Sequence, residues 1–151
     1  MASFTPKRIL VPTDFSERSD SALRQAVDLA QQYGAAVHLL HVLEPAVQTC
    51  GEDFCIDDPA VPRLENDVRR RSTARLREQA RRVARDATVD VRLEMRTGDP
   101  AAEVVNAERD ADCDLVVLSA HGEGGGGRRP FSRVAGRIVR RVRSPVLLVR
   151  N

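Results

Sequence analysis

The sequence predicts an α/β protein built on one open, parallel sheet of five strands with helices on both faces. Short apolar runs rich in Val, Leu and Ile alternate along the chain with longer segments of helical periodicity. Repeated strand–helix–strand units of this kind give parallel sheets. The chain has 151 residues, 42% of them hydrophobic, which suits one domain with one interior over residues 1–151.

The first third of the chain predicts two strands and the helix between them. Residues 8–12, RILVP, are a short apolar run ending in proline, typical of a buried strand. A helix is expected from Ser16, a candidate N-cap, to Gly34, which suits a helix C-terminus. Residues 35–45 are nearly apolar throughout, as expected of a strand covered on both faces.

The middle of the chain predicts a loop, a long helix and a half-covered strand. Residues 46–61 are polar and carry no periodic pattern, so they predict a loop. Residues 62–87 predict a helix with a thin apolar stripe and arginine over its remaining surface. We interpret those arginines as a solvated face paired with acidic neighbours, because no aromatic residues are interleaved to stack on bases. Residues 89–97 alternate in polarity, which predicts a strand with one solvated face, at or near a sheet edge.

The last third predicts two more helix–strand units. A helix over residues 98–111 opens with Asp99 as its cap and proline at its first position. Residues 114–120 predict a central strand, residues 132–144 a helix and residues 145–149, PVLLV, a final strand.

The chain order of these elements also predicts where a ligand binds. In open α/β sheets, ligands lie outside the carboxyl ends of the strands, where the strand order reverses. The first and fourth strands are the candidates for that reversal. Their carboxyl ends lead into PTDFS and SAHGEGGGG, so we expect these two segments to lie side by side.

Composition narrows the class of protein. The net charge of +2 does not by itself indicate a nucleic-acid partner, and no apolar run approaches the roughly 18 residues of a membrane span. The N-terminus lacks the pattern of a signal peptide, so we expect a cytoplasmic protein. Cys50, Cys55 and Cys113 form no disulfide framework. Cys50 and Cys55 have no second Cys or His pair nearby, so we expect reduced thiols and no metal site.

Four segments of the chain resemble the universal stress protein family. They are ILVPTDFSERSDSALRQAVDLA, LLHVLEP, GDPAAEVVNAERDADCDLVVLSAHG and IVRRVRSPVLLVR. They occur in the family's order and spacing and cover nearly the whole chain, except residues 46–90 and the glycine run. The resemblance implies a sheet ordered 3-2-1-4-5 and, usually, a homodimer. Because an exposed apolar edge strand tends to be paired, we expect residues 145–149 to form the dimer contact.

The family has one branch that binds ATP and one that does not. Binding members resemble one another in a loop of the form Gly-x-x-Gly, nine residues, then Gly-Ser or Gly-Thr. Its glycines let backbone amides approach phosphate oxygens closely. On the adenine side, the resemblance implies contacts from Pro12, Thr13 and Asp14 after the first strand, and from Val42 at the end of the second.

On the phosphate side the chain departs from the family's pattern. Alignment without gaps on PVLLVR places Ser119 and Gly122 at the first two glycine positions, and Ser132 and Arg133 where the family has Gly followed by Ser or Thr. Three of these four residues differ from the signature, and no shift of register restores it. Arginines near the next helix N-terminus still offer phosphate ligands. We therefore predict weak or absent binding of ATP. Bound ATP is expected to carry Mg, and its binding is expected to weaken as the salt concentration rises.

No catalytic constellation is recognisable, because the sequence shows neither a nucleophile elbow nor a Ser–His–Asp arrangement. His38 and His41 lie in the second predicted strand, where packing is their expected role. Asp14 is the one acid expected at the ligand end of the sheet, and it alternatively caps the first helix. We interpret the chain as a small stress-response protein that senses a nucleotide. Two alternatives stay open: a slow ATPase or phosphotransferase, and a protein that binds RNA or another anionic partner through its arginines.

Overall fold

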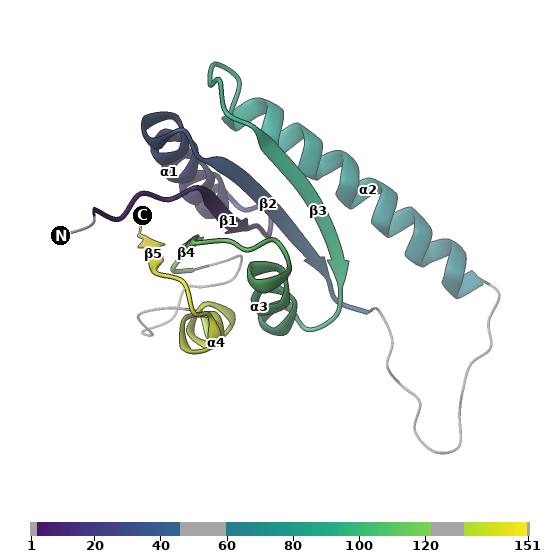
Figure 1. The fold of residues 1–151 in the computed structure, drawn as a ribbon. Coiled ribbons are helices and arrows are strands. Elements are labelled where there is room, and N and C mark those ends of the chain that lie inside the picture. Colours follow the sequence, from purple (N-terminus) through teal and green to yellow (C-terminus); the bar gives the residue numbers. More distant parts are fainter. Residues whose placement is uncertain (1–2, 46–59, 122–131, 151) are drawn as a thin grey trace.

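The computed structural model describes residues 3–45, 60–121 and 132–150, and these residues form one parallel sheet flanked by helices (Figure 1). The strands are β1 (Arg8–Pro12), β2 (Ala36–Leu43), β3 (Val91–Thr97), β4 (Leu115–Ser119) and β5 (Val146–Val149). Their order is β3-β2-β1-β4-β5, and every neighbouring pair is parallel. The predicted fold class and strand order are confirmed.

The helices of the described residues are α1 (Glu17–Tyr33), α2 (Ala60–Val83), α3 (Pro100–Asp110) and α4 (Arg133–Arg141). Local sequence sets several of their ends. The Ser16 hydroxyl accepts a hydrogen bond from the N–H of Ser19 and caps α1, while Gly34 ends it at a φ of +69°. That left-handed conformation favours glycine. The Asp99 carboxylate accepts from the N–H of Ala102 at 2.9 Å and caps α3, as the sequence predicts.

The sheet is buried between two apolar layers. Alternate residues of β1 point to opposite faces: Ile9 and Val11 pack with α1 and α2, whereas Leu10 packs with α3 and α4. Because both faces of the central strands are covered, these strands need apolar residues at every position, which explains their continuous apolar runs.

Helix α2 and strand β3 differ from their predicted bounds. Helix α2 begins at Ala60, so Pro62 lies in its first turn, where a missing N–H costs no helical hydrogen bond. It ends at Val83 instead of residue 87, because the chain turns there: Ala87 donates to the carbonyl of Ala84 at 3.1 Å. Strand β3 begins at Val91 instead of residue 89, and it lies at a sheet edge as expected.

Helix α4 is shorter than predicted for a tertiary reason. It ends at Arg141 instead of residue 144. The buried carboxylate of Glu108, on α3, accepts hydrogen bonds from the N–H groups of Arg143 and Ser144 at 3.0 and 2.7 Å. These contacts hold the chain in the extended conformation that leads into β5.

The central pairing of β1 with β4 positions the candidate site. Ile9 lies opposite Leu115 and Leu10 opposite Val116 in this parallel pair, so the two strands end at the same edge of the sheet. Thr13 and Asp14 after β1 and Ser119 at the end of β4 therefore border one cavity, as predicted, whereas residues 122–127 of the second segment lie outside the described residues. Cys50, Cys55 and Gly122 lie outside the described residues. Over the described part of the chain, none of the helices combines the length and the apolar character that a membrane crossing requires.

Candidate functional site

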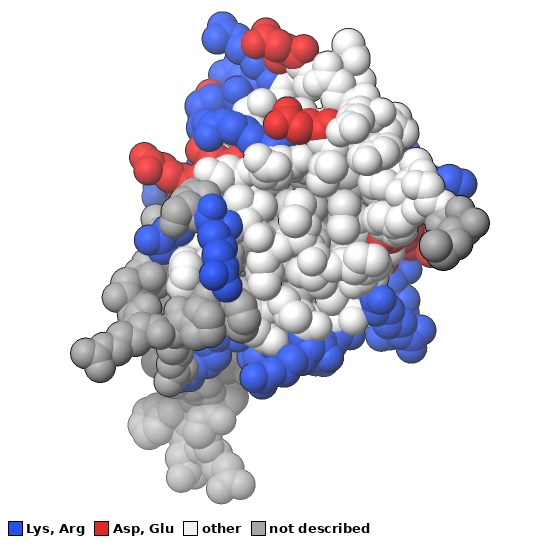
Figure 2. Space-filling model, turned by 90° about the vertical axis from the view of Figure 1, so that its left-hand side faces the viewer, with Lys and Arg blue, Asp and Glu red and all other residues white. Residues whose placement is uncertain are grey.

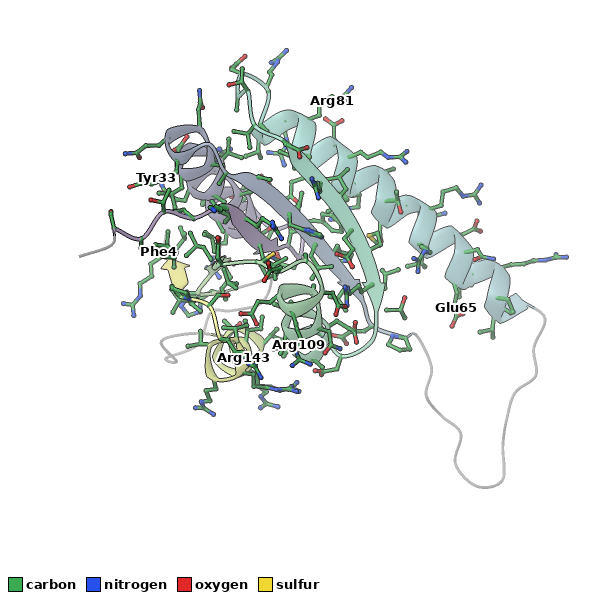
Figure 3. All side chains as sticks on the ribbon, in the orientation of Figure 1. Phe4, Tyr33, Glu65, Arg81, Arg109 and Arg143 are labelled. Carbon is green, nitrogen blue, oxygen red and sulfur yellow. The ribbon has the colours of Figure 1, made fainter. Side chains whose placement is uncertain are left out.

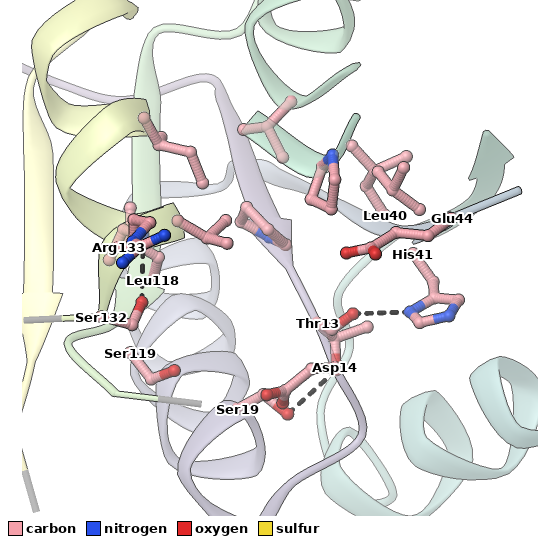
Figure 4. A pocket seen from close by; sticks show the side chains of 17 residues that line it. Thr13, Asp14, Ser19, Leu40, His41, Glu44, Leu118, Ser119, Ser132 and Arg133 are labelled. Atoms are coloured by element: carbon pink, nitrogen blue, oxygen red, sulfur yellow. Dashed lines mark hydrogen bonds between the residues drawn. The ribbon is translucent and has the colours of Figure 1, made fainter. Parts of the chain in front are cut away.

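A cavity of about 550 Å³ lies at the carboxyl ends of β1, β2 and β4, with residues from α3 and α4 on its far side (Figure 4). Its apolar wall comes from the strand ends and from the inward faces of the two helices. Those apolar residues are Pro12, Leu40, Val42, Pro100, Val104, Leu118, Val134, Ala135 and Ile138. Its polar residues are Thr13, Asp14, Ser19, His41, Glu44, Ser119, Ser132 and Arg133.

The predicted site residues converge on this cavity from four separate segments. Seven of them line it, namely Pro12, Thr13, Asp14, Val42, Ser119, Ser132 and Arg133. The eighth, Gly122, lies outside the described residues. That these residues bind a ligand stays a prediction. Their proximity follows from the parallel sheet, which gathers strand ends that are far apart in the sequence.

Thr13, directly after β1, is tied to three parts of the fold. Its N–H donates to the carbonyl of Leu40 at 2.9 Å, which extends the pairing with β2. Its hydroxyl donates to Oε1 of Gln79, on α2, at 2.8 Å and lies 3.0 Å from the hydroxyl of Ser19 on α1. Only 7% of Thr13 is exposed. The floor of the cavity is therefore rigidly connected to both helices on the opposite face of the sheet.

The next residues form a tight turn that aims Asp14 at the cavity. Oδ1 of Asp14 accepts hydrogen bonds from the N–H and the hydroxyl of Ser16, at 3.0 and 2.5 Å. Phe15 between them has a φ of +66°, a conformation that is unusual for a bulky residue. The alternative role considered for Asp14, capping α1, belongs to Ser16 instead.

His41 has a structural role that sequence analysis described only as packing. Its Nδ1 lies 2.7 Å from the carbonyl oxygen of Thr13. Because a carbonyl only accepts, Nδ1 carries the proton and donates. Burial lowers the pKa of His41 below 6.5 and the charge of Arg75 adds to this effect, whereas the bond to Thr13 and the charge of Asp14 oppose it. The neutral imidazole thus holds the turn after β1 in place.

The opposite end of the cavity is the N-terminus of α4. The Ser132 hydroxyl accepts from the N–H of Ala135 at 3.0 Å and caps the helix, and the Ser132 N–H donates to the carbonyl of Ala120 at 2.7 Å. The N–H groups of Arg133 and Val134 occupy the first helical positions, which have no acceptor within the helix. Arg133 also brings an exposed guanidinium to this end. This end can therefore bind an anion.

Sequence analysis missed Glu44 and the apolar wall from α3 and α4. Glu44 comes two residues after Val42, beyond the end of β2, and its carboxylate faces the cavity (Figure 4). No local pattern distinguishes it from any exposed loop acid. The inward faces of the two helices were recognisable from their periodicity, although not their place in a cavity. Within the described ranges, no group of three His, Cys, Asp or Glu side chains is placed to hold a metal ion.

Comparisons with known proteins agree on one family. The model of the universal stress protein family matches residues 5–150. A universal stress protein of Methanocaldococcus jannaschii is 27% identical over 147 residues, which cover 96% of this chain and 82% of the relative. The universal stress protein YxiE of Bacillus subtilis is 27% identical over 146 residues, covering 95% of this chain and 98% of the relative.

Solved structures share the fold. UspA from Lactobacillus plantarum has a TM-score of 0.83 at 23% identity and covers 98% of this chain and 100% of its own. A universal stress protein in complex with cAMP has a TM-score of 0.73 at 22% identity, and the match covers 97% of this chain and 98% of that protein. A universal stress protein from Archaeoglobus fulgidus in complex with dAMP has a TM-score of 0.61 at 18% identity, and the match covers 96% of this chain and 97% of that protein.

Proposed function

This chain belongs to the universal stress protein family, and on that premise we propose that it is a cytoplasmic stress-response protein that binds an adenine nucleotide in the cavity beside β1 and α4. The observation that carries the proposal is the convergence of seven predicted residues from four segments on one cavity. The cAMP and dAMP complexes of two proteins with the same fold support an adenine nucleotide as the ligand.

In the proposed complex, the base lies at the ends of β1 and β2. Asp14 and Val42 border this part of the cavity, and Leu40 and Val104 supply apolar surface for a planar ring. Binding pockets of this kind combine an apolar wall with a few placed polar groups. The rigid turn that Thr13 anchors keeps the polar groups in position before the ligand arrives.

The phosphate lies at the N-terminus of α4. Arg133 offers a guanidinium and a backbone N–H, Val134 offers a second N–H, and Ser119 adds a hydroxyl at the end of β4. The hydroxyl and N–H of Ser132 are already used within the fold. These donors suit a single phosphate group, so we propose a nucleoside monophosphate or cyclic monophosphate. ATP with Mg remains the weaker candidate.

We propose that the protein is a homodimer in which β5 meets its symmetry mate. Strand β5 is an edge of the sheet, and 38% of Leu147 on it is exposed. Phe4, which is 55% exposed, borders the start of the same strand beside Pro145 (Figure 3). The side of the molecule that carries this edge shows a broad uncharged area bordered by charged residues of both signs (Figure 2). Exposed apolar surface of this kind supports a protein–protein contact.

Titration calorimetry with AMP, cAMP and ATP, with and without Mg, tests the nucleotide proposal. Arg133→Ala is expected to weaken AMP binding by about 1–3 kcal/mol, the range for a lost charge-assisted hydrogen bond, and to leave adenosine binding unchanged. Raising the salt concentration is expected to weaken AMP binding for the same reason.

Arg140→Ala is the matched control, because Arg140 is an exposed arginine of the same helix that does not line the cavity. It is expected to leave AMP binding nearly unchanged. Absence of heat with every nucleotide, together with purified protein that carries none by mass spectrometry, contradicts the proposal. Release of ADP from bound ATP would instead favour the ATPase alternative.

A further inference from the structure

Within the described ranges, the cavity has at its mouth a carboxylate that no side chain or backbone group engages, that of Glu44. Glu44 is exposed, lines the cavity and has no hydrogen bond or ion pair with any residue that the structure describes. The other acid that lines the cavity, Asp14, is engaged, because it accepts hydrogen bonds from the N–H and the hydroxyl of Ser16. Glu44 therefore differs from Asp14 in that no residue of the described ranges takes up its acceptor capacity.

The cavity is also polarised from end to end. Arg133 stands at the α4 end, and the carboxylates of Asp14 and Glu44 stand at the end formed by the turn after β1 and the exit of β2 (Figure 4). A carboxylate accepts hydrogen bonds and donates none. The ligand that matches this arrangement has an anionic group at one end and N–H donors at the other.

We propose that Glu44 determines base specificity by accepting a hydrogen bond from the exocyclic amino group of the base. This inference rests on the proposed nucleotide function, which places the phosphate at Arg133 and the base at the opposite end. Adenine carries an amino group on its outer edge. A base without it leaves the Glu44 carboxylate unsatisfied under the ligand, and a base with a carbonyl there places two acceptors against each other.

The test compares AMP with purine riboside 5′-monophosphate, which differs from AMP only in lacking the amino group. Calorimetry on the unmodified protein is expected to show AMP binding about fivefold more tightly, as for one hydrogen bond at a partly solvated site. With Glu44→Ala, the preference for AMP is expected to disappear, so that the two ligands bind equally. With Glu44→Gln, whose amide oxygen still accepts, the ratio is expected to lie between these values.

The ratio of the two affinities separates recognition of the base from general electrostatics. Removing a negative charge from the cavity strengthens binding of any phosphate, but it does so equally for both ligands, so the ratio is unaffected. Glu65→Gln is the matched control. Glu65 is exposed near the N-terminal end of α2 and does not line the cavity (Figure 3). This variant is expected to keep the ratio of the unmodified protein.

Two results overturn the inference alone: equal affinities of the unmodified protein for AMP and its analogue, or a ratio that survives Glu44→Ala. If neither ligand binds the unmodified protein, the proposed function fails and the inference fails with it. Circular dichroism and thermal unfolding of each variant show that the fold is intact, so a change of ratio is assigned to the cavity.

Discussion

Among single residues, His41 shows how one side chain positions a site that it does not have to bind. Its Nδ1–H donates to the carbonyl of Thr13, and its ring packs against that of Phe15 at a tilt of 36°, with 4.2 Å between the ring centroids. The guanidinium of Arg75 lies over the Phe15 ring, 4.4 Å from its centre. A proton added to His41 would place a second positive charge beside Arg75. The neutral imidazole is therefore part of the folded structure.

The depressed pKa of His41 predicts a pH dependence of stability. The folded protein binds this proton only below a pKa that is lower than the ordinary 6.5. Between the two values the unfolded chain binds more protons, so stability rises with pH across this window and is lost as pH falls through it. His41→Asn keeps an N–H donor for the carbonyl of Thr13 but cannot titrate. We expect urea unfolding between pH 5 and 8 to show a flatter pH profile for this variant.

The comparison uses slopes, because His41→Asn also removes the ring contact with Phe15 and so lowers stability at every pH. His38 and His121 are present in both proteins, and their contributions cancel in the difference. An unchanged pH profile would show that His41 titrates alike in the folded and unfolded states.

Among the elements, helix α2 shows how several of its arginines are paired with acidic side chains. Arg70 pairs with Asp67, Arg81 with Glu78, and Arg82 with Asp20 on α1. These pairs fit the interpretation of a solvated helix face with acidic neighbours. Burial alone raises the pKa of Asp20, but hydrogen bonds from Arg82 and Gln79 outweigh it and hold the pKa below 3.8. Arg82 therefore helps to attach α2 to α1, whereas the other two pairs lie within α2.

Substitutions at the N-terminus of α4 and at the end of β4 are expected to convert the phosphate end of the cavity into a tighter ATP site. The triple variant Ser119→Gly, Ser132→Gly and Arg133→Ser restores the family's signature at these positions. We expect it to bind ATP more tightly, because glycine lets backbone amides approach the phosphates and serine adds a hydroxyl donor. Glycine at the N-cap costs the helix only a few tenths of a kcal/mol, so the fold should persist.

Calorimetry with ATP and Mg checks this expectation, and Ser119→Gly alone serves as the partial variant for comparison. Tight, Mg-dependent ATP binding by the unmodified protein would show that the altered signature does not weaken the site. No heat with the restored variant would show that these positions do not limit binding.

At the scale of the whole molecule, the two edges of the sheet differ in their surroundings. Strand β5 borders the uncharged area of Figure 2, whereas β3 at the other edge carries Arg92, Glu94 and Arg96. We expect Leu147→Arg to convert the proposed dimer to a monomer, because it buries a charge in an apolar contact. Light scattering measures the mass. Leu93→Arg on β3, where 40% of the residue is exposed, is the matched control. A dimeric mass for Leu147→Arg would place the interface elsewhere.

The sequence by itself determined the order of the elements and most of their ends. Buried strands need apolar residues at every position, and caps such as Ser16, Gly34 and Asp99 are local chemistry that can be recognised without a fold. The family resemblance added the strand order and seven of the residues that line the cavity. The element ends depend on residues that are close in the sequence, and the strand order and cavity residues follow from motifs that this chain shares with the family.

Only the tertiary structure decided the rest, because it depends on contacts between distant segments. Glu108 ends α4 from another helix, and His41 finds its acceptor in the turn after β1. Glu44 becomes a cavity residue because β2 delivers it beside the ends of β1 and β4. None of these roles has a local sequence signal, since the residue types are ordinary at their positions. Their partners are set by the packing of helices on the sheet, which the sequence specifies only through the complete fold.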